Sequence, residues 1–345
     1  MSLHGRSGQA NTAGRRRQNG DRMKKKILCS FPLPEEGVAP YREEFDICVP
    51  EKPLTYDELI KMVGEYDGLY EIVIKIDKPF LDACAAGKCR VIGNNGVGFD
   101  NVDVAYAAEK GIAIINTPKQ VTEATAEHAA TLIFATMRNI ARFDKEIRRH
   151  VWDSPYFPTK PVQVEGSTLG VVGFGRIGKR VAKKAQGMGM NVIYYDAFRA
   201  PEEVEKEFGV TFKSFEEVIE TADCITIHVP YTPENHHLFN AEIFKKMKKE
   251  AFLVNCARGP VVDEAALVEA LKSGEIKGAG LDVYEKEPHP LEELLALDNV
   301  TLTPHCASGT WKTRINMLKE GMEGVTGVLR GEAPYNVVNK EIFAK

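Results

Sequence analysis

Four residues of this chain, Arg258, Asp282, Glu287 and His305, have side chains suited to chemistry on a small anion. Each lies in or shortly after an apolar run typical of a buried strand. Ligands of parallel α/β sheets bind at the carboxyl ends of the strands, so these side chains are predicted to gather at one sheet edge. A guanidinium can hold a carboxylate through two hydrogen bonds, and a histidine beside an acid can give and take a proton near neutral pH.

Each of the four also has an ordinary interpretation when it is taken alone. Most loop arginines are solvated, Glu287 could be one more surface acid, and His305 could be a hydrogen-bonded loop histidine. Together they would supply a carboxylate-binding group, a proton donor and an acid beside that donor, a combination that chance rarely produces. The competing histidine, His289, lies between two prolines and does not directly follow a strand.

The elements that must position these residues are organised around the turn Gly173-Phe-Gly-Arg-Ile-Gly178. An apolar run, 168–172, precedes the turn, and a helix to about Gly187 follows it. In dinucleotide sites the first glycine makes the tight turn, the second lets the pyrophosphate approach the backbone, and the third lets the helix pack on the strand. The helix N-terminus offers N–H groups and a partial positive charge to the phosphates.

A second apolar run, 191–195, ends at Asp196, near the position of the acid that binds the ribose hydroxyls in NAD sites. Its charge would repel the 2′-phosphate of NADP, so NAD is the predicted cofactor, with NADH preferred over NADPH. Arg199 leaves NADP open as the alternative cofactor, because a nearby arginine can bind the 2′-phosphate. A glycine motif alone is a weak signal, but here both strands and the acid accompany it.

Length and composition exclude several classes of protein. The chain has 345 residues, 43% hydrophobic and 27% charged, which allows two domains with sizeable cores. The net charge of −4 creates no field that attracts nucleic acid or a membrane surface, and no apolar run is long enough to span a bilayer. Seven cysteines without paired CxxC motifs favour reduced thiols in a cytoplasmic protein, with no metal site.

The alternation of strand and helix patterns predicts an α/β fold with two Rossmann-like domains, doubly wound parallel sheets and a cleft between them. Residues 1–22 are rich in arginine and poor in apolar residues, so they are predicted to be a leader outside the fold, with a transit peptide as the alternative. One long buried helix is predicted over 123–150, between domains or between subunits. An irregular connector, 152–163, follows it.

A final helix over 310–330 is predicted to cross back onto the first domain. The substrate domain would then comprise residues 23–121 and 308–345, and the NAD-binding domain residues 122–307.

Six motifs follow one another along the chain, and they carry a resemblance to a known family. They are Gly96-Val-Gly-Phe-Asp-Asn-Val-Asp103, Asn116-Thr-Pro118, Gly173–Gly178, Asn255-Cys-Ala-Arg-Gly259, Gly280-Leu-Asp-Val-Tyr-Glu-Lys-Glu-Pro288 and Thr303-Pro-His305. With them the chain resembles the D-isomer-specific 2-hydroxyacid dehydrogenases, which include glyoxylate/hydroxypyruvate reductases and phosphoglycerate dehydrogenases. The resemblance covers about residues 24–340 and is highly specific.

The resemblance implies an NAD-dependent dehydrogenase, a homodimer, with Arg258, Glu287 and His305 as the catalytic set. It also implies a loop that binds the substrate carboxylate through backbone N–H groups, and a set of residues that contact the cofactor. The loop consists of Asn95, Gly96, Val97 and Gly98. The cofactor set consists of Gly173, Gly175, Arg176, Ile177, Gly178, Asp196, Val229, Pro230, Cys256, Ala257 and Asp282.

The expected reaction follows from these roles. Arg258 would hold the carboxylate and the keto oxygen of a 2-keto acid, and His305 would protonate that oxygen as hydride reaches the carbon. Glu287 would favour the imidazolium form of His305, so reduction would slow as His305 loses its proton at high pH. The reverse oxidation needs the neutral imidazole and would favour alkaline pH.

The predicted substrate is a small unphosphorylated 2-keto acid, such as glyoxylate or hydroxypyruvate, reduced to the D-2-hydroxy acid. Phosphoglycerate dehydrogenases typically carry an arginine near Asn94, and a neutral amide cannot neutralise a phosphate. Two alternatives stay open. The chain would be a 3-phosphoglycerate dehydrogenase if Lys75, Lys88 or Arg90 reached the cleft, and a nucleotide-sensing, corepressor-like binding protein would keep the same catalytic set.

Overall fold

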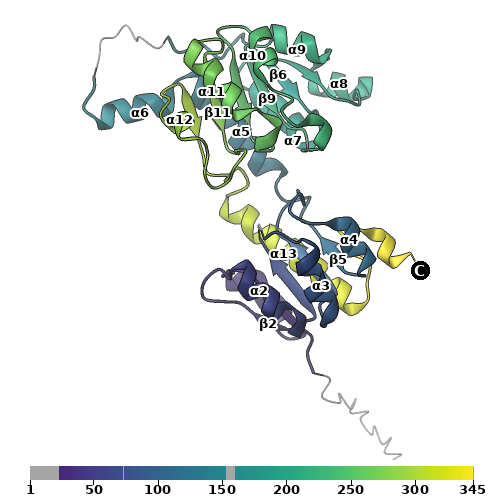
Figure 1. The fold of residues 1–345 in the computed structure, drawn as a ribbon. Coiled ribbons are helices and arrows are strands. Elements are labelled where there is room, and N and C mark those ends of the chain that lie inside the picture. Colours follow the sequence, from purple (N-terminus) through teal and green to yellow (C-terminus); the bar gives the residue numbers. More distant parts are fainter. Residues whose placement is uncertain (1–22, 73, 153–159, 345) are drawn as a thin grey trace, which may run out of the picture.

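The computed structural model describes residues 23–72, 74–152 and 160–344. In this part of the chain, two parallel β-sheets with flanking helices form two domains joined at a narrow waist (Figure 1). The predicted α/β fold with two parallel sheets is confirmed. The predicted leader and residues 153–159 of the predicted connector lie outside the described residues.

The first sheet has the strand order β2-β1-β3-β4-β5, and each of its strand pairs is parallel. Helices α2, α3 and α4 bury one face of this sheet, while α1 and α13 bury the other. The strands are β1 Lys26–Cys29, β2 Asp46–Cys48, β3 Gly68–Glu71, β4 Val91–Asn94 and β5 Ala113–Ile115, and the helices are α1 Glu35–Val38, α2 Tyr56–Met62, α3 Lys78–Ala86, α4 Val104–Glu109 and α13 Trp311–Arg330.

Helix α13 comes from the end of the chain, yet it packs on β3, β4 and β5 of the first sheet, as predicted. The side chain of Thr310 caps the helix by accepting a hydrogen bond from the N–H of Thr313. Gly321 allows the close approach to the sheet, because a Cβ at this position would lie 2.4 Å from the ring of Tyr70. The chain therefore crosses the waist twice.

The second sheet has the order β12-β11-β10-β9-β6-β7-β8 and is also parallel. Helices α5 and α7 cover one face, and α9, α10 and α11 the other. The strand order reverses between β6 and β9, where such sheets bind ligands. The strands are β6 Thr168–Val172, β7 Asn191–Tyr195, β8 Thr211–Phe212, β9 Cys224–Ile227, β10 Phe252–Asn255, β11 Gly278–Leu281 and β12 Val300–Leu302, and the helices are α5 Thr122–Met137, α6 Ile140–Arg148, α7 Arg176–Gln186, α8 Glu202–Phe208, α9 Phe215–Thr221, α10 Ala241–Lys246, α11 Glu264–Ser273 and α12 Glu292–Leu295.

The prediction of a single helix over 123–150 is wrong. The segment forms two helices, α5 and α6, separated at Asn139, which has a left-handed φ of 55°. Asparagine tolerates this conformation better than most residues, and one such residue ends an α-helical hydrogen-bond ladder. Helix α5 is buried against the second sheet and α7, whereas α6 has no buried residue and stands apart from the domain (Figure 1).

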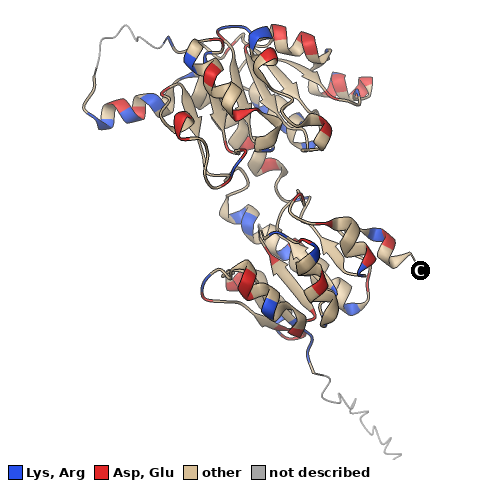
Figure 2. Cartoon of the chain, in the orientation of Figure 1, with Lys and Arg blue, Asp and Glu red and all other residues tan. Residues whose placement is uncertain are grey.

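Acidic and basic residues are interspersed along the elements of both domains (Figure 2), in line with the small net charge. Among the helices of the described ranges, none combines the length and the apolar character that crossing a bilayer requires.

Candidate active site

The three glycines of the turn between β6 and α7 each meet a different requirement. Gly173 has a φ of 97°, and a Cβ there would lie 2.6 Å from the carbonyl carbon of His228 on the neighbouring strand end. A Cβ at Gly178 would lie 2.1 Å from the carbonyl oxygen of Gly173, so the helix packs directly on the turn. A Cβ at Gly175 would meet no atom within 4 Å. This open approach, beside the free N–H groups of the first turn of α7, fits a cofactor pyrophosphate.

These contacts predict opposite effects for two equally small substitutions. Gly175→Ala should leave the melting temperature unchanged and weaken NADH binding, because the new methyl group occupies the open approach. Gly178→Ala should lower the melting temperature, because a Cβ cannot fit against the Gly173 carbonyl without moving α7. Thermal unfolding and NADH fluorescence titration of both variants measure this contrast. Equal loss of stability in both would contradict the assignment of Gly175 to the cofactor.

The adjacency of β6, β9 and β10 brings the other proposed cofactor residues beside this turn. Val229 and Pro230 follow the carboxyl end of β9, and Cys256 and Ala257 follow β10. Burial raises the pKa of the Cys256 thiol, so it stays protonated and unreactive.

Asp196 lies at the carboxyl end of β7, and its carboxylate accepts hydrogen bonds from the N–H of Phe174, at 2.7 Å, and of Phe198, at 3.0 Å. The Asp196 carboxylate thus stabilises the glycine turn. Arg199 is engaged elsewhere, because its guanidinium binds both carboxylate oxygens of Glu205 at 2.8 and 2.9 Å. This pair and the Tyr194 hydroxyl lower the pKa of Glu205 to about 2, so Glu205 remains an acceptor for Arg199.

Arg258 follows β10 and reaches across to the first domain. Its Nε donates to Asp100 at 2.8 Å and its Nη1 to the carbonyl of Ala257 at 2.8 Å. Its Nη2 lies beside Gly98, where a Cβ would come within 1.6 Å of that nitrogen. The guanidinium is therefore anchored on two sides, and its other N–H groups, one on Nη1 and two on Nη2, have no acceptor among the described residues, with Nη2 beside the predicted substrate loop. Sequence reasoning missed Asp100, although it lies within the first quoted motif.

The substrate loop after β4 has two backbone donors to offer. The N–H groups of Asn95 and Gly96 donate to carbonyls at the ends of β3 and β4, whereas those of Val97 and Gly98 have no acceptor among the described residues. Asn94 is buried and donates to the Gly98 carbonyl at 2.8 Å, so it shapes the loop instead of facing a ligand. Two free N–H groups beside the Arg258 fork form a carboxylate-binding corner.

His305 and Glu287 form a close pair at the same edge, with Nδ1 of the imidazole 2.6 Å from a Glu287 carboxylate oxygen. The other oxygen of Glu287 accepts from the N–H of Tyr284 at 3.1 Å. Burial would raise the pKa of Glu287, but the hydrogen bond and charge of His305, the Tyr284 N–H and the charge of Arg258 outweigh it and lower the pKa. Nε2 of His305 has no acceptor in the described part of the chain, so it is available to a substrate oxygen.

The buried side chain of Asp282 anchors the loop that carries His305. Its carboxylate, fully buried, accepts from the Thr303 hydroxyl at 2.6 Å and from the N–H groups of Cys306 and Ala307 at 2.9 and 2.8 Å. The resemblance implies cofactor contact for Asp282, which stays a prediction, and both carboxylate oxygens accept hydrogen bonds from the loop. Burial would raise the pKa of Asp282, and these hydrogen bonds, with one from His128, hold it low.

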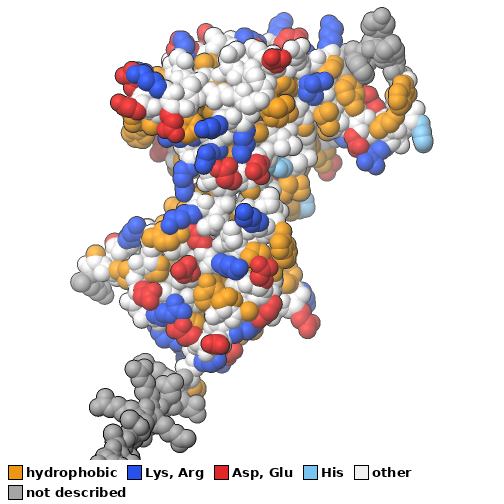
Figure 3. Space-filling view, turned by 180° about the vertical axis from the view of Figure 1, so that it is seen from behind, with side chains coloured by type: hydrophobic (Ala, Val, Ile, Leu, Met, Phe, Trp, Pro, Cys, Tyr) orange, Lys and Arg blue, Asp and Glu red, His pale blue; other side chains and the backbone are white. Residues whose placement is uncertain are grey.

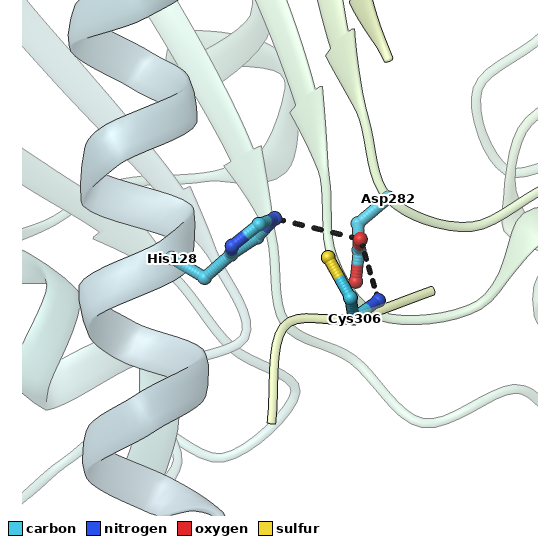
Figure 4. A group of neighbouring side chains, drawn as sticks. All are labelled: His128, Asp282 and Cys306. Atoms are coloured by element: carbon cyan, nitrogen blue, oxygen red, sulfur yellow. Dashed lines mark hydrogen bonds and ion pairs between the residues drawn. The ribbon is translucent and has the colours of Figure 1, made fainter. Parts of the chain in front are cut away.

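Figure 4 shows His128 of α5 pointing toward Asp282 and Cys306. Nε2 of His128 lies 3.0 Å from the Thr303 hydroxyl and 3.4 Å from Asp282. The possible ligand atoms of His128, Asp282 and Cys306 all lie within 4.8 Å of one another, so these side chains could hold a metal ion. The hydrogen bonds to Asp282 already account for its burial without one. Sequence reasoning missed His128, because nothing in its local pattern separates it from other helix residues.

The close pairing of His305 with Glu287 predicts that Glu287→Gln changes the pH dependence of reduction. The lowered pKa keeps Glu287 ionised around neutral pH, where its charge favours the imidazolium that reduction needs. The glutamine removes this charge, so the alkaline limb of the reduction profile should move to lower pH. Profiles of kcat/KM against pH for both proteins test this, and an unmoved limb would mean that Glu287 does not act on His305.

Comparison with known proteins gives a consistent result. Residues 130–307 match the family model described as D-isomer specific 2-hydroxyacid dehydrogenase, NAD binding domain. A glyoxylate reductase from Pyrococcus horikoshii is 40% identical over 329 residues, which cover 93% of this chain and 98% of that protein. Among solved structures, a protein from Thermus thermophilus is 37% identical with a TM-score of 0.83, over 91% of this chain and 99% of that one. An NADPH-dependent glyoxylate/hydroxypyruvate reductase from Sinorhizobium meliloti is 31% identical with a TM-score of 0.79, and the match covers 92% of this chain and 98% of that one.

Proposed function

This chain belongs to the D-isomer specific 2-hydroxyacid dehydrogenase family, and we propose that it reduces a small 2-keto acid to the D-2-hydroxy acid with NADH, and catalyses the reverse reaction. The observation that carries the proposal is the edge shared by Arg258, the His305–Glu287 pair and the glycine turn. A carboxylate-binding fork and a proton donor stand there beside the open approach at Gly175.

The proposed mechanism assigns one task to each group. The N–H groups of Val97 and Gly98 and the fork of Arg258 bind the substrate carboxylate and orient the ketone. NADH, when bound, supplies the hydride that reaches the carbonyl carbon. Negative charge grows on the keto oxygen, Arg258 stabilises it, and Nε2 of His305 gives it a proton. Glu287 stabilises the imidazolium before transfer, and Asp282 and His128 hold the loop that carries His305.

A preference for NADH over NADPH is part of the proposal. The Asp196 carboxylate would bind the ribose hydroxyls and repel a 2′-phosphate. The guanidinium of Arg199 is bound to Glu205 and is therefore not free to bind a 2′-phosphate, which supports this preference. Asp196→Ser should therefore lower the ratio of kcat/KM with NADH to kcat/KM with NADPH, mainly by raising the value with NADPH. Comparable values for both cofactors in the unmodified enzyme would contradict the assignment.

The proposed substrate carries no phosphate. Lys88 and Arg90 precede β4, at the amino end of the sheet, while the substrate loop follows its carboxyl end. Lys75, the remaining candidate for binding a phosphate, has an exposed side chain with Asp77 3.4 Å away. We expect glyoxylate or hydroxypyruvate to be used better than 3-phosphohydroxypyruvate.

The experiment is a comparison of kcat/KM for these three keto acids in one buffer, with NADH and with NADPH. If the phosphorylated ketone is preferred by tenfold, about 1.4 kcal/mol of transition-state stabilisation, the chain is a 3-phosphoglycerate dehydrogenase. If no keto acid is turned over while NADH binds, the corepressor-like function is favoured instead.

The proposal extends to assembly, domains and location. Ile140, Ile147, Val151 and Trp152, on α6 and just after it, are exposed on a segment that stands apart from the domain, which supports a homodimer formed through this face. Light scattering of the purified protein tests the dimer. We further propose the domain boundaries 23–121 with 308–345 and 122–307, and a cytoplasmic location, supported by seven free cysteines.

A further inference from the structure

A pocket lies at the waist, lined by residues of α5, α7 and α13. Its volume is about 650 Å³, and both domains line it. Figure 3 shows Lys and Arg side chains, with a few acids among them, gathered on this narrow part of the molecule. The cationic lining residues are Lys119, Arg176, Lys179, Arg180 and Lys312, and the acidic ones are Glu123 and Glu127. We call this space the waist pocket.

The acids of the waist pocket are already matched by cations. Glu123 accepts from Arg180 at 2.6 Å and from Lys184 at 3.2 Å, and Glu127 lies 3.9 Å from Lys184. The side-chain ammonium groups of Lys119, Lys179 and Lys312 form no ion pair within the described ranges, although the backbone N–H of Lys119 donates to the Glu320 carboxylate at 3.3 Å. Lys119 lies over the ring of Tyr335, and Lys179 stands 5.7 Å from the ring centre of Phe174. Cationic side chains therefore outnumber acidic ones in the lining of the pocket, which gives it a surplus of positive charge.

Backbone dipoles add to this positive potential. The first turns of three helices line the pocket: Thr122 and Glu123 begin α5, Arg176 begins α7, and Lys312 and Thr313 lie in the first turn of α13. Each helix has more than ten residues, and a helix N-terminus carries roughly half a positive charge. The end of α7 is the one proposed to face the cofactor pyrophosphate, which leaves the ends of α5 and α13 for the waist pocket. These two ends, with three lysine side chains that have no carboxylate partner among the described residues, make a site that favours an anion with more than one charge.

The waist pocket is separate from the proposed active site. Of the residues assigned above to cofactor, substrate or catalysis, only Arg176 lines it, and the guanidinium of Arg176 donates to the carbonyl of Pro118. We propose that the waist pocket binds a small molecule bearing a phosphate dianion, with Lys179 of one domain and Lys312 of the helix from the other as its main ligands. Such a ligand bridges the two domains at the point where the chain crosses between them.

The test measures binding of inorganic phosphate to the enzyme saturated with NADH, which fills the cofactor site. Isothermal titration at constant ionic strength should show one saturable site. The double variant Lys179→Gln/Lys312→Gln should weaken phosphate binding at least tenfold, while Lys61→Gln/Lys249→Gln, with the same charge change at exposed lysines elsewhere, should bind like the unmodified enzyme.

Three results would overturn the proposal. One is the absence of saturable binding to the unmodified enzyme. Another is equal weakening in both double variants, which would show only a general charge effect. The third is binding that disappears when NADH is saturating, which would place the phosphate in the cofactor site. The test does not depend on which keto acid the enzyme reduces, so a failure here leaves the proposed function standing.

Discussion

His305→Ala should lower kcat for keto-acid reduction by about 10²–10⁴-fold, the usual contribution of a general acid. The reason is that Nε2 of His305 faces the proposed substrate position, while Nδ1 is held 2.6 Å from Glu287. Affinity for NADH should be unchanged, because none of the hydrogen bonds or ion pairs that His305 makes within the described ranges involves the glycine turn. Steady-state kinetics with glyoxylate and fluorescence titration with NADH measure the two effects separately.

His289→Ala is the matched control, because this exposed histidine occupies the neighbouring proline-rich loop and makes no side-chain hydrogen bond in the described part of the chain. It should leave kcat unchanged. A large loss in His289→Ala with little effect in His305→Ala would place the proton donor on the proline-rich loop and contradict the role given to His305.

Arg258→Lys should lower kcat/KM by about 10²-fold or more, although the charge is kept. The guanidinium uses Nε for Asp100 and Nη1 for the Ala257 carbonyl, and Nη2 remains for the substrate. An ammonium has a single nitrogen and cannot bind all three in this geometry. Most of the loss should therefore be catalytic, with the melting temperature maintained.

A conservative change at an exposed arginine serves as the control for this variant. Arg148 lies on α6, where Asp144 one turn away is its only ion-pair partner among the described residues, and Arg148→Lys should have normal kinetics. Full activity of Arg258→Lys would contradict the proposal that the planar guanidinium is needed to bind the substrate.

The parts of the fold that could be predicted from sequence are those with local causes. The glycine turn needs a positive φ at Gly173, space at Gly175 and contact at Gly178, and each requirement is tied to a fixed position between a strand and a helix. The pairing of His305 with Glu287 also followed from their positions after adjacent strands of a parallel sheet.

The parts that could not be predicted depend on partners far apart in the chain. Asp100 binds Arg258 across 158 residues, and His128 meets Thr303 across 175, so no local pattern marks either. The break at Asn139 was missed because apolar periodicity continues into α6, while one left-handed residue decides where α5 ends. The edge strands β2 and β8 have only three and two residues, too few for a periodic signal.

The stereochemistry of the product tests the central claim most directly. The enzyme, supplied with NADH and hydroxypyruvate, should produce glycerate in the D form, as chiral chromatography of the reaction mixture would show. Formation of the L form, or consumption of no NADH with any small 2-keto acid, would contradict the assignment of this site to D-2-hydroxyacid chemistry.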